Sequence, residues 1–317
     1  MHLVYASDEN YLKPMAVAIA AAYHHASRPE ELTVHVLSCE IPDAKWKAWY
    51  DFLIAKLPRS AKIVRHDVSR EKLAIGPSWH SSYGTYARLY IDEFLPDIDW
   101  CVYCDVDTLF TDDPFKLEAE FENGVILKGA SDPLAVDDCR HDWYRKHKLP
   151  DPGDKHICAG FLVMDLSAYR EGGIGRKCVE LILSHPDIKY PDQDALNINC
   201  AGRTGILARR WGLFSWDAFV EGMPGCIHFA ADLPWKVGGS RYPDLHDAQL
   251  LWFKYAKKLL GLKRGDFYST SWRWRFLRML LARWALLALC RPLGHFPAFY
   301  NTRLGDYYRR HYNKKGV

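Results

Sequence analysis

The chain has 317 residues, a length that suits one sizeable α/β domain with an appendage better than two full domains. Hydrophobic residues make up 49% and charged residues 26% of the chain, a globular composition that excludes wholesale disorder. The net charge of +3 is unevenly divided, because residues 263–317 carry twelve Lys or Arg against Asp266 and Asp306, which makes this segment +10 and the remainder −7. We therefore divide the chain into a body, residues 1–262, and a basic aromatic tail, residues 263–317.

The nine cysteines are an odd number, scattered without regular spacing from Cys39 to Cys290. They predict no disulfide framework and favour a reducing compartment. Cys101 and Cys104 form a Cys-x-x-Cys motif, but residues three apart on a strand point to opposite faces, so we expect two buried thiols and not a zinc or redox pair. The first residues contain no basic region followed by a long apolar stretch, so we expect no signal peptide.

Strands and helices alternate along the first hundred residues. Short apolar or alternating runs predict strands at 2–6, 32–38, 61–68 and 100–105. Helices are expected at 11–25, 44–55 and 82–94. Further on, strands are expected at 124–128 and 160–165 and helices at 169–184 and 193–200, and the segments 203–210 and 225–230 complete the body. This alternation predicts an α/β fold with a largely parallel sheet and helices on both of its faces.

Two aspartates separated by one residue follow the apolar run 100–104. Asp105 and Asp107 would stand at the carboxyl end of a strand, where parallel sheets bind their ligands. If the backbone stays extended, both carboxylates point to one face and can share one Mg²⁺ or Mn²⁺ ion. Such an ion would neutralise a diphosphate and stabilise it as a leaving group. The alternative is a polar turn closed by Thr108, or a helix cap.

Three later segments add polar groups. Asp192, Gln193 and Asp194 begin an expected helix, and capping explains one acid but not all three side chains. His228 stands at a strand end, where it is either a third protein ligand of the ion or the partner of a backbone group. Arg88 lies on an expected helix with an apolar face and would meet either a phosphate or, as an ordinary ion pair, a carboxylate.

The motifs, taken in order, resemble those of a known family. They are Ala6-Ser7-Asp8-Glu9-Asn10-Tyr11, Tyr86-Ala87-Arg88-Leu89, Asp105-Val106-Asp107, Ala159-Gly160, Asp192-Gln193-Asp194-x-Leu196-Asn197, and His228-Phe229 with Pro234-Trp235. Over residues 1–240 the chain is similar to glycosyltransferase family 8, the retaining GT-A enzymes that include bacterial lipopolysaccharide α-galactosyl- and α-glucosyltransferases. The resemblance implies a GT-A fold, a UDP-hexose donor (galactose or glucose), Mn²⁺ or Mg²⁺, and a glycan acceptor such as lipopolysaccharide.

The resemblance also implies a role for each matching position. The nucleoside would contact Ala6, Asp8, Asn10, Tyr11 and the Val106 backbone. The ion would be held by Asp105, Asp107 and His228, and Arg88 would reach the donor sugar or the diphosphate. The sugar pocket would be lined by Ala159 and Gly160, with Asp192 and Gln193 beside the anomeric carbon and Asp132 near the sugar or the acceptor.

Two departures from the family pattern affect the donor. Cys158 precedes the Ala-Gly pair where the family usually has Asn, and a thiol is a poor hydrogen-bond partner. The segment after His228 is one residue shorter than usual, and Leu233 stands where the family has the Lys that contacts the diphosphate. Lys236 is the candidate substitute, from the other side of the Pro-Trp pair. The donor sugar therefore stays unassigned.

Retention of configuration, which the resemblance implies, normally calls for a carboxylate nucleophile. Gln193 is expected nearest the reacting face, and an amide is a poor nucleophile. Either Asp192 or Asp132 attacks covalently, or the acceptor enters on the leaving group's own face while the diphosphate takes its proton. We favour the second hypothesis.

Other classes of protein compete with a transferase. A nucleotide-sugar-binding protein with little or no turnover would fit Cys158 and Leu233. A nucleotidyltransferase also uses paired aspartates, but no Gly-rich phosphate loop follows the first expected strand. A self-glycosylating initiator would need an acceptor tyrosine, and the 18 tyrosines leave that choice open.

The tail contains a segment, residues 272–284, that is rich in Trp, Arg and Leu. On a helix Arg275, Arg278 and Arg283 fall on one arc, and the apolar residues Leu277, Leu280, Leu281, Trp284 and Leu287 fall opposite. The uninterrupted apolar run is far shorter than the ~20 residues that cross a bilayer. A basic amphipathic helix of this kind is typical of one that lies on an anionic membrane, although it could also pack on the body. We expect a cytoplasmic protein, peripheral on the inner face of the membrane, with a lipid-linked acceptor and no nucleic-acid partner.

Overall fold

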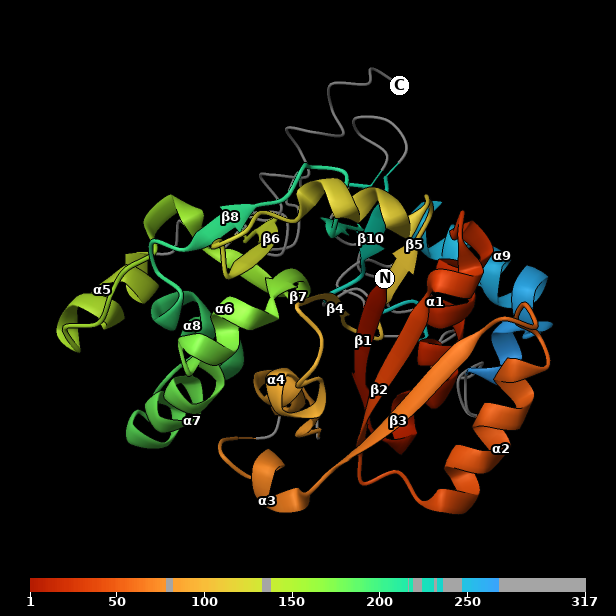
Figure 1. The fold of residues 1–317 in the computed structure, drawn as a ribbon, viewed down its shortest axis with the longest axis horizontal. Helices are drawn as coiled ribbons and strands as arrows, with labels where there is room; N and C mark the ends of the chain where they lie inside the picture. The colour runs from red at the N-terminus through yellow and green to blue at the C-terminus, as the bar shows by residue number, and fades with distance from the viewer. Residues whose placement is uncertain are drawn as a thin grey trace, which may run out of the picture.

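The structure, a computed structural model, describes residues 1–77, 82–132, 138–215, 217–218, 224–230, 233–235 and 247–267. Within these residues a seven-stranded sheet has the order β3-β2-β1-β4-β7-β6-β8 (Figure 1). In that order the strands are Lys62–Val68, Thr33–Cys39, His2–Ser7, Trp100–Cys104, Ile157–Asp165, Leu127–Ser131 and Thr204–Ile206. A smaller sheet joins β5, β10 and β9, which are Thr108–Phe110, Cys226–His228 and Leu213–Phe214.

The large sheet is mostly parallel. Strand β7 alone among its seven strands runs against the rest, because it pairs antiparallel with both β4 and β6 while the other pairings are parallel. The beginning of β7 therefore lies at the same edge as the carboxyl ends of β1 and β4. The expected α/β architecture with a largely parallel sheet is confirmed, and the reversed strand positions the site.

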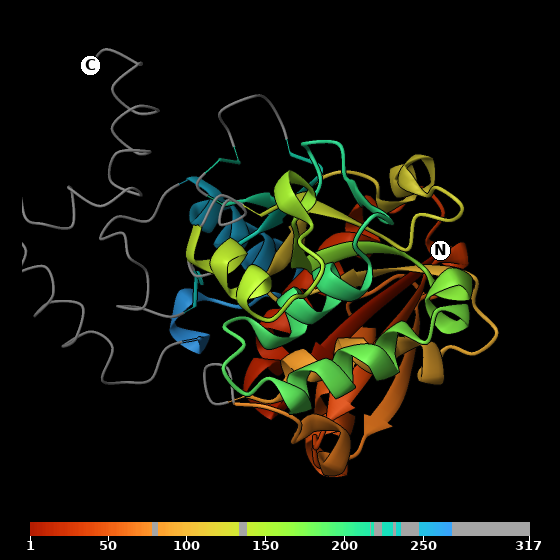
Figure 2. The same ribbon diagram turned by 90° about the vertical axis from the view of Figure 1, so that its left-hand side faces the viewer.

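Helices cover both faces of this sheet, as Figures 1 and 2 show. One face carries α1 (Leu12–His25), α2 (Asp43–Ile54) and α9 (Asp247–Leu260). The other face carries α4 (Ile91–Phe94), α6 (Leu166–Glu171), α7 (Ile174–Ser184) and α8 (Pro191–Asn199). The remaining helices are the short α3 (Arg70–Leu73) and α5 (Asp138–Lys146).

Strand periodicity divides the core into two layers. Leu3 and Tyr5 pack under α1, whereas Val4 between them belongs to the opposite layer. Cys101 and Cys104 divide in the same way, which confirms that they are two buried thiols on opposite faces. Seven cysteines whose side chains the structure describes are free, and they are Cys39, Cys101, Cys104, Cys158, Cys178, Cys200 and Cys226.

Several boundaries differ from the predictions. The expected helix 82–94 is a 3₁₀ segment, Gly84–Tyr90, followed by α4, and the expected helix 169–184 is broken into α6 and α7 at Gly172 and Gly173. Gly173 has a φ of +57°, a left-handed conformation that glycine adopts without strain. The strand expected at 124–128 begins only at Leu127. Elements β5, β9, α5 and α9 were not predicted.

Only the first residues of the tail fall within the described chain. Phe267 packs against Trp252 of α9 with ring centroids 4.9 Å apart, and Lys13 Nζ donates to the carbonyl of Asp266 at 2.7 Å. The amphipathic segment 272–284 lies outside the described residues. None of the helices described is long and apolar enough to span a membrane.

Candidate functional site

The polar motifs gather where three strands of the large sheet meet. Strand β1 pairs with β4 as far as Tyr5 and Cys104, so Ala6, near the end of β1, and Asp105, directly after β4, lie at the same edge of the sheet. The Asp105 N–H donates to the carbonyl oxygen of Gly160 on β7 at 2.8 Å. The reversal of β7 thus brings Ala159 and Gly160 next to Asp105.

Asp105, Asp107 and His228 form the one group of three His, Cys, Asp or Glu residues in the described part of the chain whose potential ligand atoms all lie within 4.8 Å of one another. His228 reaches the aspartates because β10 pairs antiparallel with β5, with His228 opposite Thr108. The Phe229 N–H also donates to the Asp107 carbonyl at 2.8 Å. The backbone at the aspartates is not extended, since Thr108 closes a turn onto the Asp105 carbonyl through its N–H (3.1 Å) and Oγ1 (2.8 Å). The polar turn and the convergence of the acids are therefore both present.

The carboxylate oxygens of Asp105 and Asp107 do not all have hydrogen-bond partners within the protein. Oδ1 of Asp105 accepts from Arg88 and Tyr103, which leaves Oδ2 facing His228 Nε2 at 3.9 Å. Oδ1 of Asp107 is buried and has no hydrogen-bond partner among the described residues, with His228 Nε2 at 3.4 Å. Two carboxylate oxygens and an imidazole nitrogen form a donor set that fits Mn²⁺ or Mg²⁺.

Two pKa shifts reflect this crowding. Burial raises the pKa of Asp105; Arg88 opposes that effect, and the carboxylate of Asp107 raises the pKa further. Burial lowers the pKa of His228, but Asp107 and the Cys158 sulfur outweigh burial, so that the pKa lies well above its ordinary value. Two acids that repel each other in a buried place are stabilised by a cation.

Because Gly160 has no side chain, the space next to His228 and Asp105 stays open. A Cβ at this position would lie 2.2 Å from His228 Cε1 and 2.8 Å from Asp105 Oδ2. Contacts this short require the neighbouring groups to move, so no side chain fits at residue 160 while His228 and Asp105 keep their positions.

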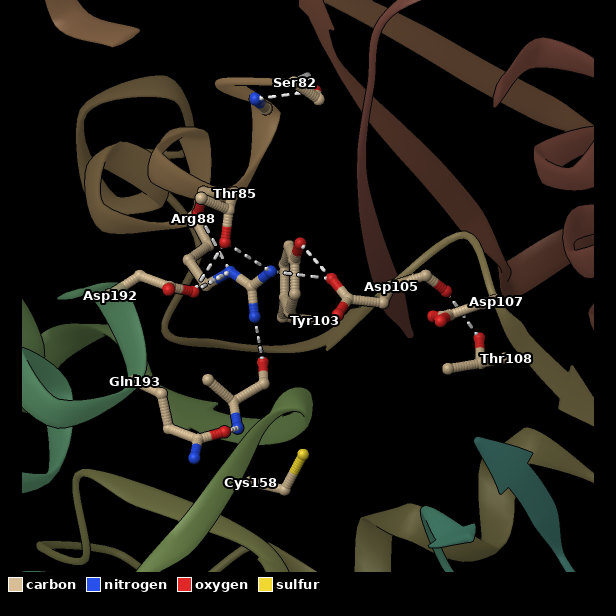
Figure 3. Close-up of polar contacts among 12 residues, drawn as sticks. Ser82, Thr85, Arg88, Tyr103, Asp105, Asp107, Thr108, Cys158, Asp192 and Gln193 are labelled. Atoms are coloured by element: carbon tan, nitrogen blue, oxygen red, sulfur yellow. Dashed lines mark hydrogen bonds and ion pairs between the residues drawn. The ribbon is translucent and has the colours of Figure 1, made fainter. Parts of the chain in front are cut away.

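Arg88 lies between the two acidic motifs and is almost completely buried (Figure 3). Its Nη2 donates to Asp105 Oδ1 at 2.8 Å, its Nε lies 3.2 Å from Asp192 Oδ2, and its Nη1 donates to the Ala159 carbonyl at 2.5 Å. Its guanidinium carbon also lies 4.6 Å from the centre of the Tyr103 ring. Burial lowers the pKa of Arg88, but Asp105, Tyr103 and Asp192 outweigh it and keep the guanidinium charged. Arg88 thus contacts carboxylates, the second of the two alternatives considered for it.

The residues expected beside the sugar are connected by hydrogen bonds. The Ala159 N–H donates to Gln193 Oε1 at 3.0 Å, and Gln193 Nε2 donates to Asp132 Oδ2 at 2.7 Å. Asp192 Oδ2 accepts from Thr85 Oγ1 at 2.7 Å. The structure therefore brings Asp132 to Gln193, from segments 61 residues apart, and ties Asp192 to Arg88.

The residues expected around the nucleoside follow β1. Asp8 accepts from the Asn10 N–H at 2.8 Å and so caps the short 3₁₀ segment Glu9–Tyr11. Asn10 is exposed, Tyr11 packs at the border of the core, and Val106 is partly buried. Nucleoside binding by these residues stays a prediction, and Lys236 lies outside the described residues.

Three contributors to the site were missed in the sequence. Thr85 lies one turn before Arg88 and contacts both Arg88 and Asp192, and this i, i+3 spacing was a usable signal. Tyr103 donates to Asp105 Oδ1 at 2.7 Å, and as part of an apolar run it gave no signal. His156, completely buried behind Asp132, gave none either.

Comparison with known proteins identifies the family of this chain. The family model of glycosyl transferase family 8 matches residues 2–229. A putative glycosyltransferase of Haemophilus influenzae is 24% identical over 220 residues, and the lipopolysaccharide 1,2-glucosyltransferase of Escherichia coli is 23% identical over 218. The alignments cover 68% and 67% of this chain and 64% and 61% of those relatives, which is less than two thirds of their length.

Solved structures show the same fold. The galactosyltransferase LgtC, in complex with donor and acceptor sugar analogs, superposes with a TM-score of 0.68 at 25% identity, covering 86% of this chain and 99% of LgtC. The bifunctional glycosyltransferase WbbM shares the fold with a TM-score of 0.65 at 18% identity, covering 82% of this chain and 50% of WbbM. Since the family model covers most of the chain and the fold agrees, the chain belongs to glycosyl transferase family 8 and has the GT-A fold.

Proposed function

We propose that this protein transfers a hexose, galactose or glucose, from a UDP-sugar to a saccharide acceptor with retention, using Mn²⁺ or Mg²⁺ held by Asp105, Asp107 and His228. The observation that carries the proposal is the meeting of these three side chains around a buried, unsatisfied Asp107 oxygen. A divalent cation bound there would supply Lewis-acid stabilisation to the departing diphosphate.

Arg88 prepares this site in two ways. Its guanidinium holds Asp105 Oδ1, which leaves Oδ2 free to face His228. Its charge, buried between Asp105 and Asp192, also raises the positive potential at the edge where an anionic diphosphate would lie. Buried charges of this kind are fixed in place before the substrate arrives, so they need little reorganisation during the reaction.

The contacts of the acids favour entry of the acceptor on the leaving group's own face. Asp192 already accepts from Thr85 and pairs with Arg88, and Asp132 accepts from Gln193 and faces His156. A carboxylate stabilised by several donors is a weaker nucleophile than a free one. Both candidates for covalent attack are stabilised in this way, which supports the route without a covalent adduct.

We further propose that the acceptor is a lipid-linked saccharide and that the tail lies on an anionic membrane surface. The support is the charge of +10 over residues 263–317 and the relationship to the lipopolysaccharide 1,2-glucosyltransferase of Escherichia coli. Deletion of residues 268–317 should then abolish binding to anionic vesicles, and unchanged binding would remove this part of the proposal.

Donor hydrolysis tests the activity without knowledge of the acceptor. The full chain is incubated with UDP-galactose, UDP-glucose or UDP-N-acetylglucosamine with and without Mn²⁺, and released UDP is measured. We expect metal-dependent release from a UDP-hexose, and a loss of about 100-fold or more in Asp105→Asn and in Asp107→Asn. Asp97→Asn, an isosteric change at an exposed position, is the matched control and should leave the rate unchanged.

Two outcomes contradict the proposal. If no donor releases UDP while UDP still binds, the protein is a nucleotide-sugar-binding protein. If both Asp105→Asn and Asp107→Asn keep the wild-type rate, the two aspartates do not hold the cation.

A further inference from the structure

A buried chain of polar groups continues behind Gln193, away from the aspartates that face the cation. His156 precedes β7 and is completely buried. Its Nδ1 lies 3.2 Å from Asp132 Oδ2, while its Nε2 lies 3.1 Å from the Tyr144 hydroxyl and 3.4 Å from Asp194 Oδ1. The ring thus connects the loop after β6 with α5 and α8.

The hydrogen-bond directions in this chain determine what the imidazole donates. The Tyr144 hydroxyl gives its single proton to Asp194 Oδ1 at 2.9 Å, so toward His156 it can only accept. On the other side, Asp132 Oδ2 accepts from Gln193 Nε2 and offers His156 Nδ1 an acceptor as well. Both ring nitrogens therefore face oxygen atoms that can accept a hydrogen bond, Nδ1 that of Asp132 and Nε2 those of Tyr144 and Asp194.

The same chain determines how Gln193 is oriented. Its Oε1 is already taken by the Ala159 N–H, so its Nε2 must point to Asp132. The same Asp132 oxygen lies 3.2 Å from His156 Nδ1, so the imidazole contributes to the direction of that carboxylate. A shift of the Asp132 carboxylate would leave the Gln193 amide without its partner.

We propose that His156 is a positioning residue: it holds the Asp132 carboxylate toward Gln193 and so fixes the Gln193 amide at the sugar side of the site. The proposal rests on the proposed function, because Gln193 and Asp132 matter there only if a sugar is transferred. His156 itself touches no substrate, since it is completely buried. Its effect is on the rate of transfer, not on binding of the nucleotide.

Two single substitutions distinguish the contacts of Nδ1 from those of Nε2. In His156→Asn the amide nitrogen takes the place of Nδ1 and keeps the link to Asp132. In His156→Gln it takes the place of Nε2 and keeps only the links to Tyr144 and Asp194. Each variant loses the buried contacts of one ring nitrogen, so both should unfold at a lower temperature than the wild type.

The measurement is kcat and the donor KM for UDP release with Mn²⁺. We expect His156→Gln to lose about 10- to 100-fold in kcat relative to His156→Asn, with the donor KM within about threefold in both. If the role of His156 were purely structural, kcat would fall equally in both variants. Equal kcat values in the two folded variants would overturn the proposal.

Tyr144→Phe keeps the proposal testable if neither His156 variant folds. It removes one hydroxyl on the far side of the ring and leaves Asp132, His156 and Gln193 in place. We expect a lower melting temperature with kcat within about threefold of wild type, and a loss of about tenfold or more in kcat would overturn the proposal. Wild-type protein that releases no UDP contradicts the proposed function instead, so the two failures are distinguishable.

Discussion

The site has two halves: the cation side, with Asp105, Asp107 and His228, and the sugar side, with Asp192, Gln193 and Asp132. They differ in whether their polar atoms find hydrogen-bond partners within the protein. On the cation side, Asp107 Oδ1 is buried without a hydrogen-bond partner among the described residues, and His228 carries a raised pKa between acids. On the sugar side, Asp192, Gln193 and Asp132 all have hydrogen-bond partners supplied by Thr85, Ala159 and one another. Under the proposed function, this difference means that a bound cation would complete the first half, whereas contacts within the protein already hold the second half in place.

The largest expected effect comes from filling the space between the cation ligands. In Gly160→Ala the added Cβ would press on His228 and Asp105, so Mn²⁺ affinity and turnover should fall by about 100-fold or more. The measurements are the Mn²⁺ dependence and the rate of UDP release. Gly265→Ala is the matched control, because nothing lies within 4 Å of a Cβ there. Wild-type activity in Gly160→Ala would mean that this space is not used.

Arg88 belongs to both halves, so its replacement should affect both. Arg88→Lys keeps the charge but loses the planar fork that contacts Asp105, Asp192 and the Ala159 carbonyl. We expect the free energy of unfolding to fall by about 2 kcal/mol or more. Turnover should fall by about 10- to 100-fold. Arg176→Lys, at an exposed helical ion pair with Glu180, is the control. A fully active Arg88→Lys would contradict the bridging role.

A histidine outside the site, His35, makes the stability of the protein sensitive to acid. This limits the pH range in which the two halves of the site can be compared. His35 on β2 lies between His2 and His66, with ring nitrogens 2.9 and 3.0 Å apart, and burial lowers its pKa to about 3. Because the folded pKa is below the unfolded value of about 6.5, its contribution to stability is complete above pH 6.5 and is lost as the pH falls toward 3. Chemical denaturation should show about 2 kcal/mol less stability at pH 5 than at pH 8 from this residue. A His35→Asn variant with the wild-type pH dependence would contradict this assignment.

The smallest effect is expected at Cys158. Its sulfur lies 3.7 Å from His228 Nδ1, a weak contact that a hydroxyl can partly replace. Cys158→Ser should therefore keep the rate of UDP release within about threefold at saturating Mn²⁺. A loss of more than about tenfold would show that the thiol orients His228 strongly.

Much of the fold and the core of the site were predictable because their signals are local. Alternating strands and helices gave the sheet, and the order of short motifs identified Asp105, Asp107 and His228 as a group. The turn at the aspartates was foreseen only as an alternative to metal binding. In the structure Thr108 closes that turn and the carboxylates still converge, so the two alternatives were compatible.

The remaining features depend on contacts between distant segments. The reversal of β7, which places Gly160 beside Asp105 and Cys158 beside His228, follows from its pairing with β4 and β6 and has no local signal. His156 belongs to no motif in the sequence, and its two carboxylate neighbours come from other segments of the chain. The break between α6 and α7 was different, since the adjacent Gly172 and Gly173 were a usable signal.

The most direct test of the account is Mn²⁺ binding itself, measured by the loss of the free-ion electron paramagnetic resonance signal in the presence of UDP. Wild-type protein should bind Mn²⁺ with a saturable site that Asp107→Asn weakens by about 100-fold. Asp97→Asn should bind as the wild type does. Equal Mn²⁺ binding by wild type, Asp105→Asn and Asp107→Asn would contradict the claim that Asp105, Asp107 and His228 hold the cation.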